Sequence, residues 1–218
     1  MNLETPDGAA RGIEALVLDW GGVLTPALDV ALRRWAERDG VDFDHFREVL
    51  RSWHESGDSP SHHLERGTLA EREFERLLAA ELTARGSVVD PEGLLARVLA
   101  DLSLLDPRML AAVRAARRGG LRTALLSNSW GENYPEALWQ DLFDVVVISG
   151  RVGLRKPEPG IFTHTAQALG LPPSRCVLVD DIEHNVAAAT AAGMVAVHHR
   201  TVEQTLAELE ELLQLSLR

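Results

Sequence analysis

Four short apolar runs in the second half of the chain alternate with segments of helical character, and this alternation limits the possible folds more than any other feature. The runs are rich in Val, Leu and Ile and lack a strict polar–apolar alternation, as expected for strands that are covered on both faces. Helical segments between such strands are typical of the crossovers in a parallel sheet. The predicted strands are Leu121–Leu126, Val145–Ile148, Cys176–Val179 and Met194–Val197.

The segments around these strands carry start and stop signals of helices. Pro157–Leu169 has a proline in its first turn and Gly170 directly after its end, and Ile182–Ala192 is followed by Gly193. We therefore predict an α/β fold with a mostly parallel sheet and helices on both faces. Two further helices are predicted at Pro107–Arg117 and Val202–Leu217.

A fifth strand, Leu16–Leu18, lies far upstream of the others. The roughly eighty residues between it and the next strand show helical periodicity and no convincing strand. We expect an all-helical cap, residues 25–104, inserted after the first strand into a core made of residues 1–24 and 105–218. The cap helices are predicted at Leu28–Arg38, Asp44–Trp53, Leu69–Ala84 and Pro91–Leu102.

The composition excludes some classes of partner. The formal net charge of −11 and the pI near 5.2 argue against a nucleic-acid partner, because phosphate backbones are bound by clustered Lys and Arg. No apolar run approaches the ~20 residues that span a bilayer, so no membrane partner is expected. Cys176 is the only cysteine, which leaves no intramolecular disulfide and favours a reducing compartment. We expect a soluble cytoplasmic protein, either a monomer or a homodimer.

Polar side chains follow each strand at the edge where a parallel sheet binds ligands, which is the edge formed by the carboxyl ends of its strands. Taken singly, each has an ordinary explanation as a turn former, a helix cap or a surface residue. Their convergence at one edge is harder to explain without a ligand. The residues are Asp19 after the first strand, Ser127 and Asn128 after the second, Lys156 after the third, and Asp180 and Asp181 after the fourth.

This set of residues indicates phosphoryl chemistry. Asp19, Asp180 and Asp181 would repel one another unless a divalent ion held them, and oxygen ligands of this kind favour Mg²⁺. Lys156 and the Ser127 hydroxyl would hold phosphoryl oxygens while charge shifts in the transition state. Asp19 would attack phosphorus to form an aspartyl-phosphate, and water would then release phosphate.

The order of these motifs resembles that of the haloacid dehalogenase-like superfamily of hydrolases. The last two motifs are especially similar to the phosphatase domain of mammalian soluble epoxide hydrolases. The Asp-x-Gly-Gly start and the segment His63–Gly67 more closely resemble bacterial sugar-1-phosphate phosphatases of the same superfamily. The motifs that carry the resemblance are Leu18-Asp19-Trp20-Gly21-Gly22-Val23-Leu24, Leu126-Ser127-Asn128-Ser129, Val152-Gly153-Leu154-Arg155-Lys156-Pro157-Glu158-Pro159 and Leu178-Val179-Asp180-Asp181-Ile182-Glu183-His184-Asn185.

The resemblance implies a Rossmann-like core with a helical cap inserted after the first motif. It implies that Asp19 is both nucleophile and metal ligand, and that Asp181 and the main-chain carbonyl of Gly21 are further metal ligands. We also count Asp180 as a metal ligand. The expected substrate contacts, apart from Ser127 and Lys156, are Asn128, Gly22, His63 and Glu65.

Gly21 departs from the pattern of the superfamily, because most phosphatases in it carry an aspartate at this position. That aspartate protonates the leaving oxygen and later activates water, which is worth roughly 10²–10⁴ in rate. The cap could supply another donor, with His54, His62, His63 and Glu65 as candidates. Alternatively, the leaving group needs less protonation, or the site binds phosphate without turnover.

The sequence thus predicts a Mg²⁺-dependent phosphatase that hydrolyses a small phosphorylated metabolite, such as a sugar phosphate. One alternative is a metal-independent 2-haloacid dehalogenase in which Asp19 attacks carbon, although Asp180 and Asp181 count against it. The other is a catalytically weakened phosphate-binding module, which Gly21 suggests.

Overall fold

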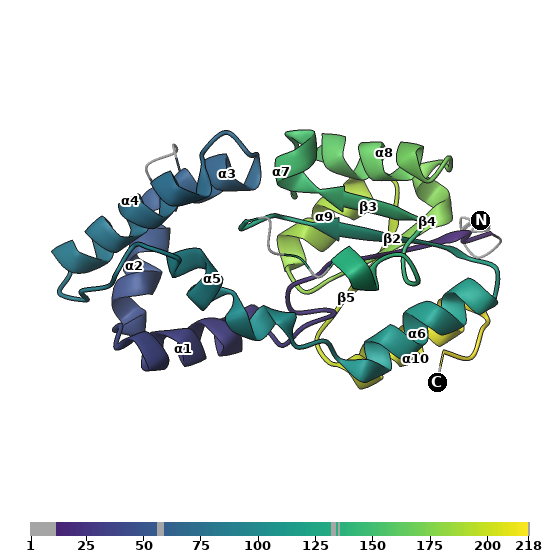
Figure 1. The fold of residues 1–218 in the computed structure, drawn as a ribbon. Helices are drawn as coiled ribbons and strands as arrows, with labels where there is room; N and C mark the ends of the chain where they lie inside the picture. The colour runs from purple at the N-terminus through teal and green to yellow at the C-terminus, as the bar shows by residue number, and fades with distance from the viewer. Residues whose placement is uncertain (1–11, 56–58, 132–133, 135, 218) are drawn as a thin grey trace, which may run out of the picture.

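The computed structural model describes residues 12–55, 59–131, 134 and 136–217. Its centre is one parallel sheet in the order β3-β2-β1-β4-β5 (Figure 1). The sheet confirms the predicted α/β fold, and all five of its strands lie within one residue of the predicted bounds at each end. The strands are β1 (Ala15–Leu18), β2 (Arg122–Ser127), β3 (Val145–Ile148), β4 (Cys176–Asp180) and β5 (Val195–His198).

Helices cover both faces of the sheet because side chains on its central strands point alternately to two apolar clusters. Leu16 and Leu18 pack into the cluster under α6 and α10, whereas Ala15 and Val17 pack into the cluster under α8 and α9. Both faces of β1 are therefore buried, which explains its continuous apolar run. These helices are α6 (Pro107–Arg118), α8 (Pro159–Ala168), α9 (Glu183–Ala191) and α10 (Val202–Leu213); short elements are η2 (Glu136–Leu138), α7 (Ser149–Val152) and η3 (Pro173–Arg175).

A second lobe, here called the helical lobe, consists of the helices between β1 and α6 (Figure 1). They surround an apolar cluster of their own, in which Trp35, Phe46 and Phe74 are almost completely buried. Trp53 also packs into this cluster. The helical lobe contains α1 (Leu28–Asp39), α2 (Phe43–Glu55), α3 (Pro60–Glu65), α4 (Glu71–Ala84), α5 (Leu94–Val98) and η1 (Ala100–Ser103).

Two details of the helical lobe differ from the sequence prediction. The six-residue helix α3 was not predicted, because it is too short to show a helical period. The single helix predicted over Pro91–Leu102 is instead α5 followed by η1, and α5 begins after Gly93 in the left-handed conformation (φ 66°). This positive φ is easily adopted by glycine and interrupts a regular helix.

The five-stranded sheet and its helices α6 to α10 are here called the sheet lobe. Two connecting segments, one after β1 and one before α6, join it to the helical lobe. They run side by side, since the amide of Asp106 donates a hydrogen bond to the carbonyl of Leu24 at 2.8 Å. The carboxyl ends of β1, β2 and β4 therefore face the helical lobe. Among the residues that the structure describes, no helix combines the length and the apolar character needed to cross a membrane.

Candidate active site

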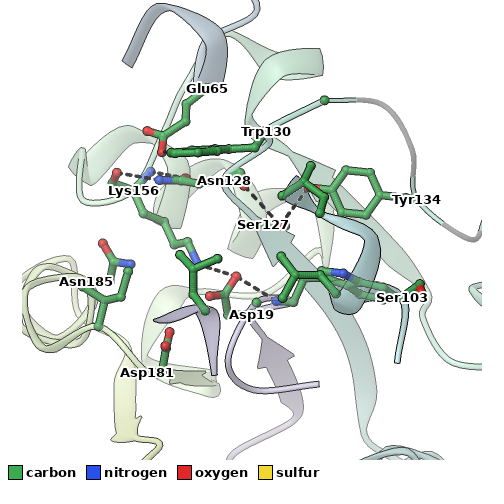
Figure 2. Close-up of a pocket in the computed structure, with 17 residues that line it drawn as sticks. Asp19, Glu65, Ser103, Ser127, Asn128, Trp130, Tyr134, Lys156, Asp181 and Asn185 are labelled. Carbon is green, nitrogen blue, oxygen red and sulfur yellow. Dashed lines mark hydrogen bonds and ion pairs between the residues drawn. The ribbon is translucent and has the colours of Figure 1, made fainter. Parts of the chain in front are cut away.

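A cavity of about 160 Å³ lies between the two lobes, at the carboxyl ends of the strands (Figure 2). The sheet lobe contributes residues from the ends of β1, β2 and β4 and from the loop before α8. The helical lobe contributes the beginning of α1, the end of α3 and the segment around η1. The lining residues are Asp19, Trp20, Gly21, Leu28, Glu65, Leu99, Leu102, Ser103, Ser127, Asn128, Trp130, Gly131, Tyr134, Lys156, Asp181, Ile182 and Asn185.

Asp19 lies at the floor of this cavity, directly after β1. Its amide donates to the carbonyl of Val179 at 3.0 Å, so the pairing of β1 with β4 extends as far as the candidate nucleophile. Its Oδ1 accepts a hydrogen bond from the amide of Trp20 at 2.7 Å. Burial raises the pKa of Asp19 to about 7, against the lowering effect of Lys156.

Lys156 is buried, with 1% of its surface exposed, and its ammonium lies between two carboxylates. Its Nζ is 2.8 Å from Asp19 Oδ1 and 2.6 Å from Asp180 Oδ2. Burial alone would lower the pKa of Lys156, but the charges of Asp19 and Asp180 outweigh it and raise the pKa above its ordinary value. Lys156 therefore carries a fixed positive charge beside Asp19.

Asp180 and Asp181 have different surroundings although they are adjacent in the chain. Asp180 is completely buried, and its Oδ1 accepts hydrogen bonds from the amide of Ile182 (2.9 Å) and from Asn185 Nδ2 (3.0 Å). Asp181 is partly exposed and lines the cavity. Burial, together with the charge of Asp180, raises the pKa of Asp181 to about 6.

Gly22 makes room for the Asp181 carboxylate. A Cβ atom on Gly22 would lie 2.2 Å from Asp181 Oδ2, and the φ of Gly22 is 76°, which favours glycine. Gly22 itself does not line the cavity, although the sequence suggested it as a substrate contact. The structure instead places its backbone against a carboxylate.

The site fits a divalent cation on two observations. Asp19, Asp180 and Asp181 each offer an oxygen within 4.8 Å of the others, and together with Lys156 they leave an excess of negative charge when ionised. In addition, Asn185 Oδ1 is buried without a hydrogen-bond partner, which is costly unless a ligand satisfies it. All of these donors are oxygen atoms, the type that Mg²⁺ prefers.

Ser127 is the last residue of β2 and Asn128 directly follows it, and their side chains make different contacts. Ser127 Oγ lies 3.0 Å from the Tyr134 hydroxyl, within the cavity. Asn128 holds the main chain of Lys156 at both ends: its Oδ1 accepts from the Lys156 amide at 2.8 Å, and its Nδ2 donates to the Lys156 carbonyl at 3.0 Å (Figure 2). The side-chain amide of Asn128 thus holds the backbone of Lys156 in position.

Of the four proton donors considered in the helical lobe, only Glu65 lines the cavity. Both of its oxygens are engaged, since Oε1 accepts from Trp130 Nε1 at 3.1 Å and Oε2 pairs with Arg155. His63 Nδ1 instead lies 3.0 Å from Thr68 Oγ1. The ring of His54 packs edge-on against that of His62, with 5.9 Å between the ring centroids.

Gly21 lines the cavity beside Asp19, and the space next to it is open. A Cβ atom built on Gly21 meets no atom within 4 Å, and its φ is not in the left-handed region. The fold therefore does not require glycine here. The side-chain acid is missing because of the sequence, not because of a steric constraint.

Sequence reasoning missed the apolar part of the cavity. Trp130 and Tyr134 follow β2 closely, but no spacing pattern marked them, and the leucines contributed by the helical lobe read as ordinary core residues. Asn185 did show a signal, because it lies one helical turn after the Asp180-Asp181 pair. A position that close to two candidate ligands could have been included among them.

The comparisons with known proteins agree with this geometry. The family profile for haloacid dehalogenase-like hydrolases matches residues 13–193. The mouse protein "Acyl-CoA dehydrogenase family member 10" is 30% identical over 93% of this chain, which spans 19% of that protein. A phosphoserine phosphatase from Thermus thermophilus is 31% identical over 88% of this chain, which spans 66% of that protein.

A solved structure shares the fold. It is a haloacid dehalogenase-like family enzyme from Bacteroides thetaiotaomicron, in complex with magnesium and inorganic phosphate, with a TM-score of 0.61 and 20% identity. The match covers 88% of this chain and 96% of that one. Because the family profile spans most of the sequence and its motifs meet in one cavity, this chain belongs to the haloacid dehalogenase-like hydrolase family.

Proposed function

We propose that the protein is a Mg²⁺-dependent phosphatase that acts on a small phosphorylated metabolite, with residues 25–104 serving as the cap. The observation that carries the proposal is the position of Asp19, a buried carboxylate held by the ammonium of Lys156 within the group of three carboxylates. A metal-independent dehalogenase does not need a group of three carboxylates that can hold a cation. A phosphatase, in contrast, needs a cation there to offset the charge of its substrate.

Each residue of the site has a separate role in the proposed reaction. An Asp19 oxygen attacks phosphorus, the bond from phosphorus to the leaving oxygen breaks, and an aspartyl-phosphate forms. Lys156 and Ser127 hold phosphoryl oxygens, and Asn128 keeps Lys156 in place. Water then attacks the phosphorus, releases phosphate and restores the Asp19 carboxylate.

The metal site would be formed by Asp19, Asp181 and the carbonyl of Gly21, with Asp180 and Asn185 beside them. When bound, Mg²⁺ offsets the repulsion between the attacking carboxylate and the phosphoryl group. Relatives support this assignment, since the Thermus thermophilus protein is a phosphoserine phosphatase and the Bacteroides thetaiotaomicron enzyme was crystallised with magnesium and phosphate.

The proposal is tested by steady-state phosphate release from a broad panel of phosphate monoesters. We expect release that needs Mg²⁺, stops with EDTA, and falls by a factor of about 10³ or more in Asp19→Asn. Asp44→Asn is the matched control, because Asp44 lies exposed on α2 and should leave the rate unchanged. Halide release from a 2-haloacid in the presence of EDTA, or phosphate-ester binding without turnover across the panel, would contradict the proposal.

A further inference from the structure

The lining of the cavity changes character with distance from Asp19. Charged and amide side chains surround the place of the phosphoryl group. Much of the remaining lining is apolar: Leu28, Leu99 and Leu102 come from the helical lobe, and Trp20 and Trp130 come from the sheet lobe. The three leucines are only partly buried, so their exposed apolar surface is available to a ligand.

The helical lobe offers few partners for a polyhydroxylated substrate. Among the described lining residues, its polar side chains are those of Glu65 and Ser103. Both oxygens of Glu65 are already engaged by Trp130 and Arg155. A sugar bound here would leave several hydroxyl groups without partners, which weakens binding strongly. An apolar organic group has no hydroxyl groups that would lose their hydrogen bonds on binding.

The size of the cavity limits that organic group. The cavity of about 160 Å³ is smaller than drug-sized pockets, which have ~300–1,000 Å³. One ring beside a phosphoryl group is compatible with this space.

The leaving oxygen also lacks an effective proton donor. Gly21 carries no side chain, and the Glu65 carboxylate already pairs with the guanidinium of Arg155 and accepts a hydrogen bond from the indole N–H of Trp130. Of the remaining hydroxyls, burial raises the pKa of Tyr134, which makes its phenol a weaker acid. A phenolate leaves with little help, because phenols have a pKa of ~10 whereas water, with a pKa of ~15.7, represents aliphatic alcohols more closely.

These observations converge on one class of substrate. We propose that the leaving group is a small aromatic alcohol, so that the enzyme hydrolyses monoaryl phosphates in preference to sugar phosphates. This inference rests on the proposed phosphatase function. The aromatic ring lies against Trp130 and the leucines of the helical lobe, and its oxygen departs as the phenolate while Asp19 takes the phosphoryl group.

The test compares kcat/KM of the full chain with Mg²⁺ on three kinds of ester: ring-substituted phenyl phosphates, a fluorinated alkyl phosphate matched to phenol in acidity, and glucose 1-phosphate. We expect at least a tenfold preference for phenyl phosphate over the matched alkyl ester, because only the ring buries apolar surface. We expect a preference of at least 10²-fold over glucose 1-phosphate. Within the phenyl series, the rate should rise with the acidity of the phenol.

A variant tests the role of the missing acid. Gly21→Asp places a carboxyl group in the open space beside Asp19 and should raise the rate on alkyl esters by roughly 10²–10⁴, and that on acidic phenyl esters by much less. Tyr134→Phe should leave the ratio of kcat/KM on aryl and alkyl esters unchanged, because Tyr134 does not protonate the leaving oxygen. The series on the unaltered enzyme requires no variant to fold.

The two proposals fail differently. No phosphate release from any ester would remove the phosphatase function itself. Phosphate release in which glucose 1-phosphate equals or exceeds phenyl phosphate, or in which the matched alkyl ester does as well as the aryl one, would overturn the aryl preference and leave the phosphatase standing. A loss of alkyl turnover in Tyr134→Phe would overturn the argument about the proton donor.

Discussion

At the scale of single residues, Gly21 and Gly22 are neighbours with opposite requirements. Gly22 has a positive φ, and its α-carbon faces the Asp181 carboxylate so closely that no Cβ fits. Gly21 faces open space with an ordinary φ. The fold therefore requires glycine at position 22 but not at position 21.

The pair gives a matched test. Gly22→Ala costs about 1–2 kcal/mol for the left-handed backbone and displaces the Asp181 carboxylate, so we expect a lower stability and a loss of Mg²⁺ affinity of about 10- to 100-fold. Gly21→Ala should keep or slightly raise the free energy of unfolding. Urea denaturation and Mg²⁺ titration of both variants measure this, and equal effects at the two positions would contradict the explanation.

At the scale of elements, α6 shows how a local signal determines a boundary. Asp106 caps the helix, since its Oδ1 accepts hydrogen bonds from the amides of Arg108 (2.8 Å) and Met109 (3.4 Å). Pro107 occupies the first turn, where its missing N–H costs nothing. These signals lie next to each other in the sequence, which is why the predicted start of this helix is correct.

The contribution of the N-cap residue Asp106 to stability should depend on pH. The hydrogen bond from Arg108 lowers the pKa of Asp106, while burial opposes it. A lowered pKa means that the cap stabilises the folded state above the unfolded pKa of ~3.9, and that this contribution disappears as the pH falls through the lower folded pKa.

We therefore expect Asp106→Ala to cost about 0.5–2 kcal/mol at pH 7, and the difference from the unaltered protein to shrink towards pH 3. Asp106→Asn, which can still cap, should cost less at pH 7. Urea denaturation at both pH values measures the effect. A difference that stays constant with pH would show that the carboxylate charge plays no part.

At the scale of the whole molecule, the two lobes are held together by side chains far apart in the sequence. Glu65 at the end of α3 pairs with Arg155 in the loop before α8, and Arg66 pairs with Glu158. The first pair is nearly buried, with side-chain exposures of 11% and 13%, whereas the second is about one-third exposed. Only the first pair closes the cavity wall, because Glu65 lines it.

Burial predicts unequal effects for the two pairs. Arg155→Met leaves the Glu65 carboxylate unpaired in the interface, and separation of the lobes would return it to water. Hydrogen exchange in α3 and α7 should therefore become faster. Arg66→Met removes a partly exposed pair worth about 1 kcal/mol or less and should change exchange little. Adding Glu65→Gln to Arg155→Met should restore protection, and no restoration would contradict this account.

Much of the sheet lobe follows from local patterns. Apolar runs such as Val145–Ile148 define strands, and adjacent polar residues such as Asp19 and Asp180 mark their carboxyl ends. A parallel sheet brings these ends to one edge, so the group around Asp19 could be predicted before its geometry was known. Its resemblance to a known family followed from the same residues.

The helical lobe could be predicted only in outline. Periodicity located α1, α2 and α4, but it missed α3 and could not say which of its polar residues reaches the cavity. Glu65 lines the cavity whereas its near neighbour His63 does not, because the contacts with Trp130 and Arg155 orient this end of α3.

The sequence by itself determined the family, the parallel sheet and the identity of the residues around Asp19, because these depend on local order along the chain and on strand ends that must meet. Only the tertiary structure decided that Asn128 holds the main chain of Lys156, that Gly22 is sterically required while Gly21 is not, and that leucines and tryptophans line the cavity beside Asp19. These features depend on packing between segments far apart in the sequence, such as those of Gly22 and Asp181. No local pattern encodes such contacts.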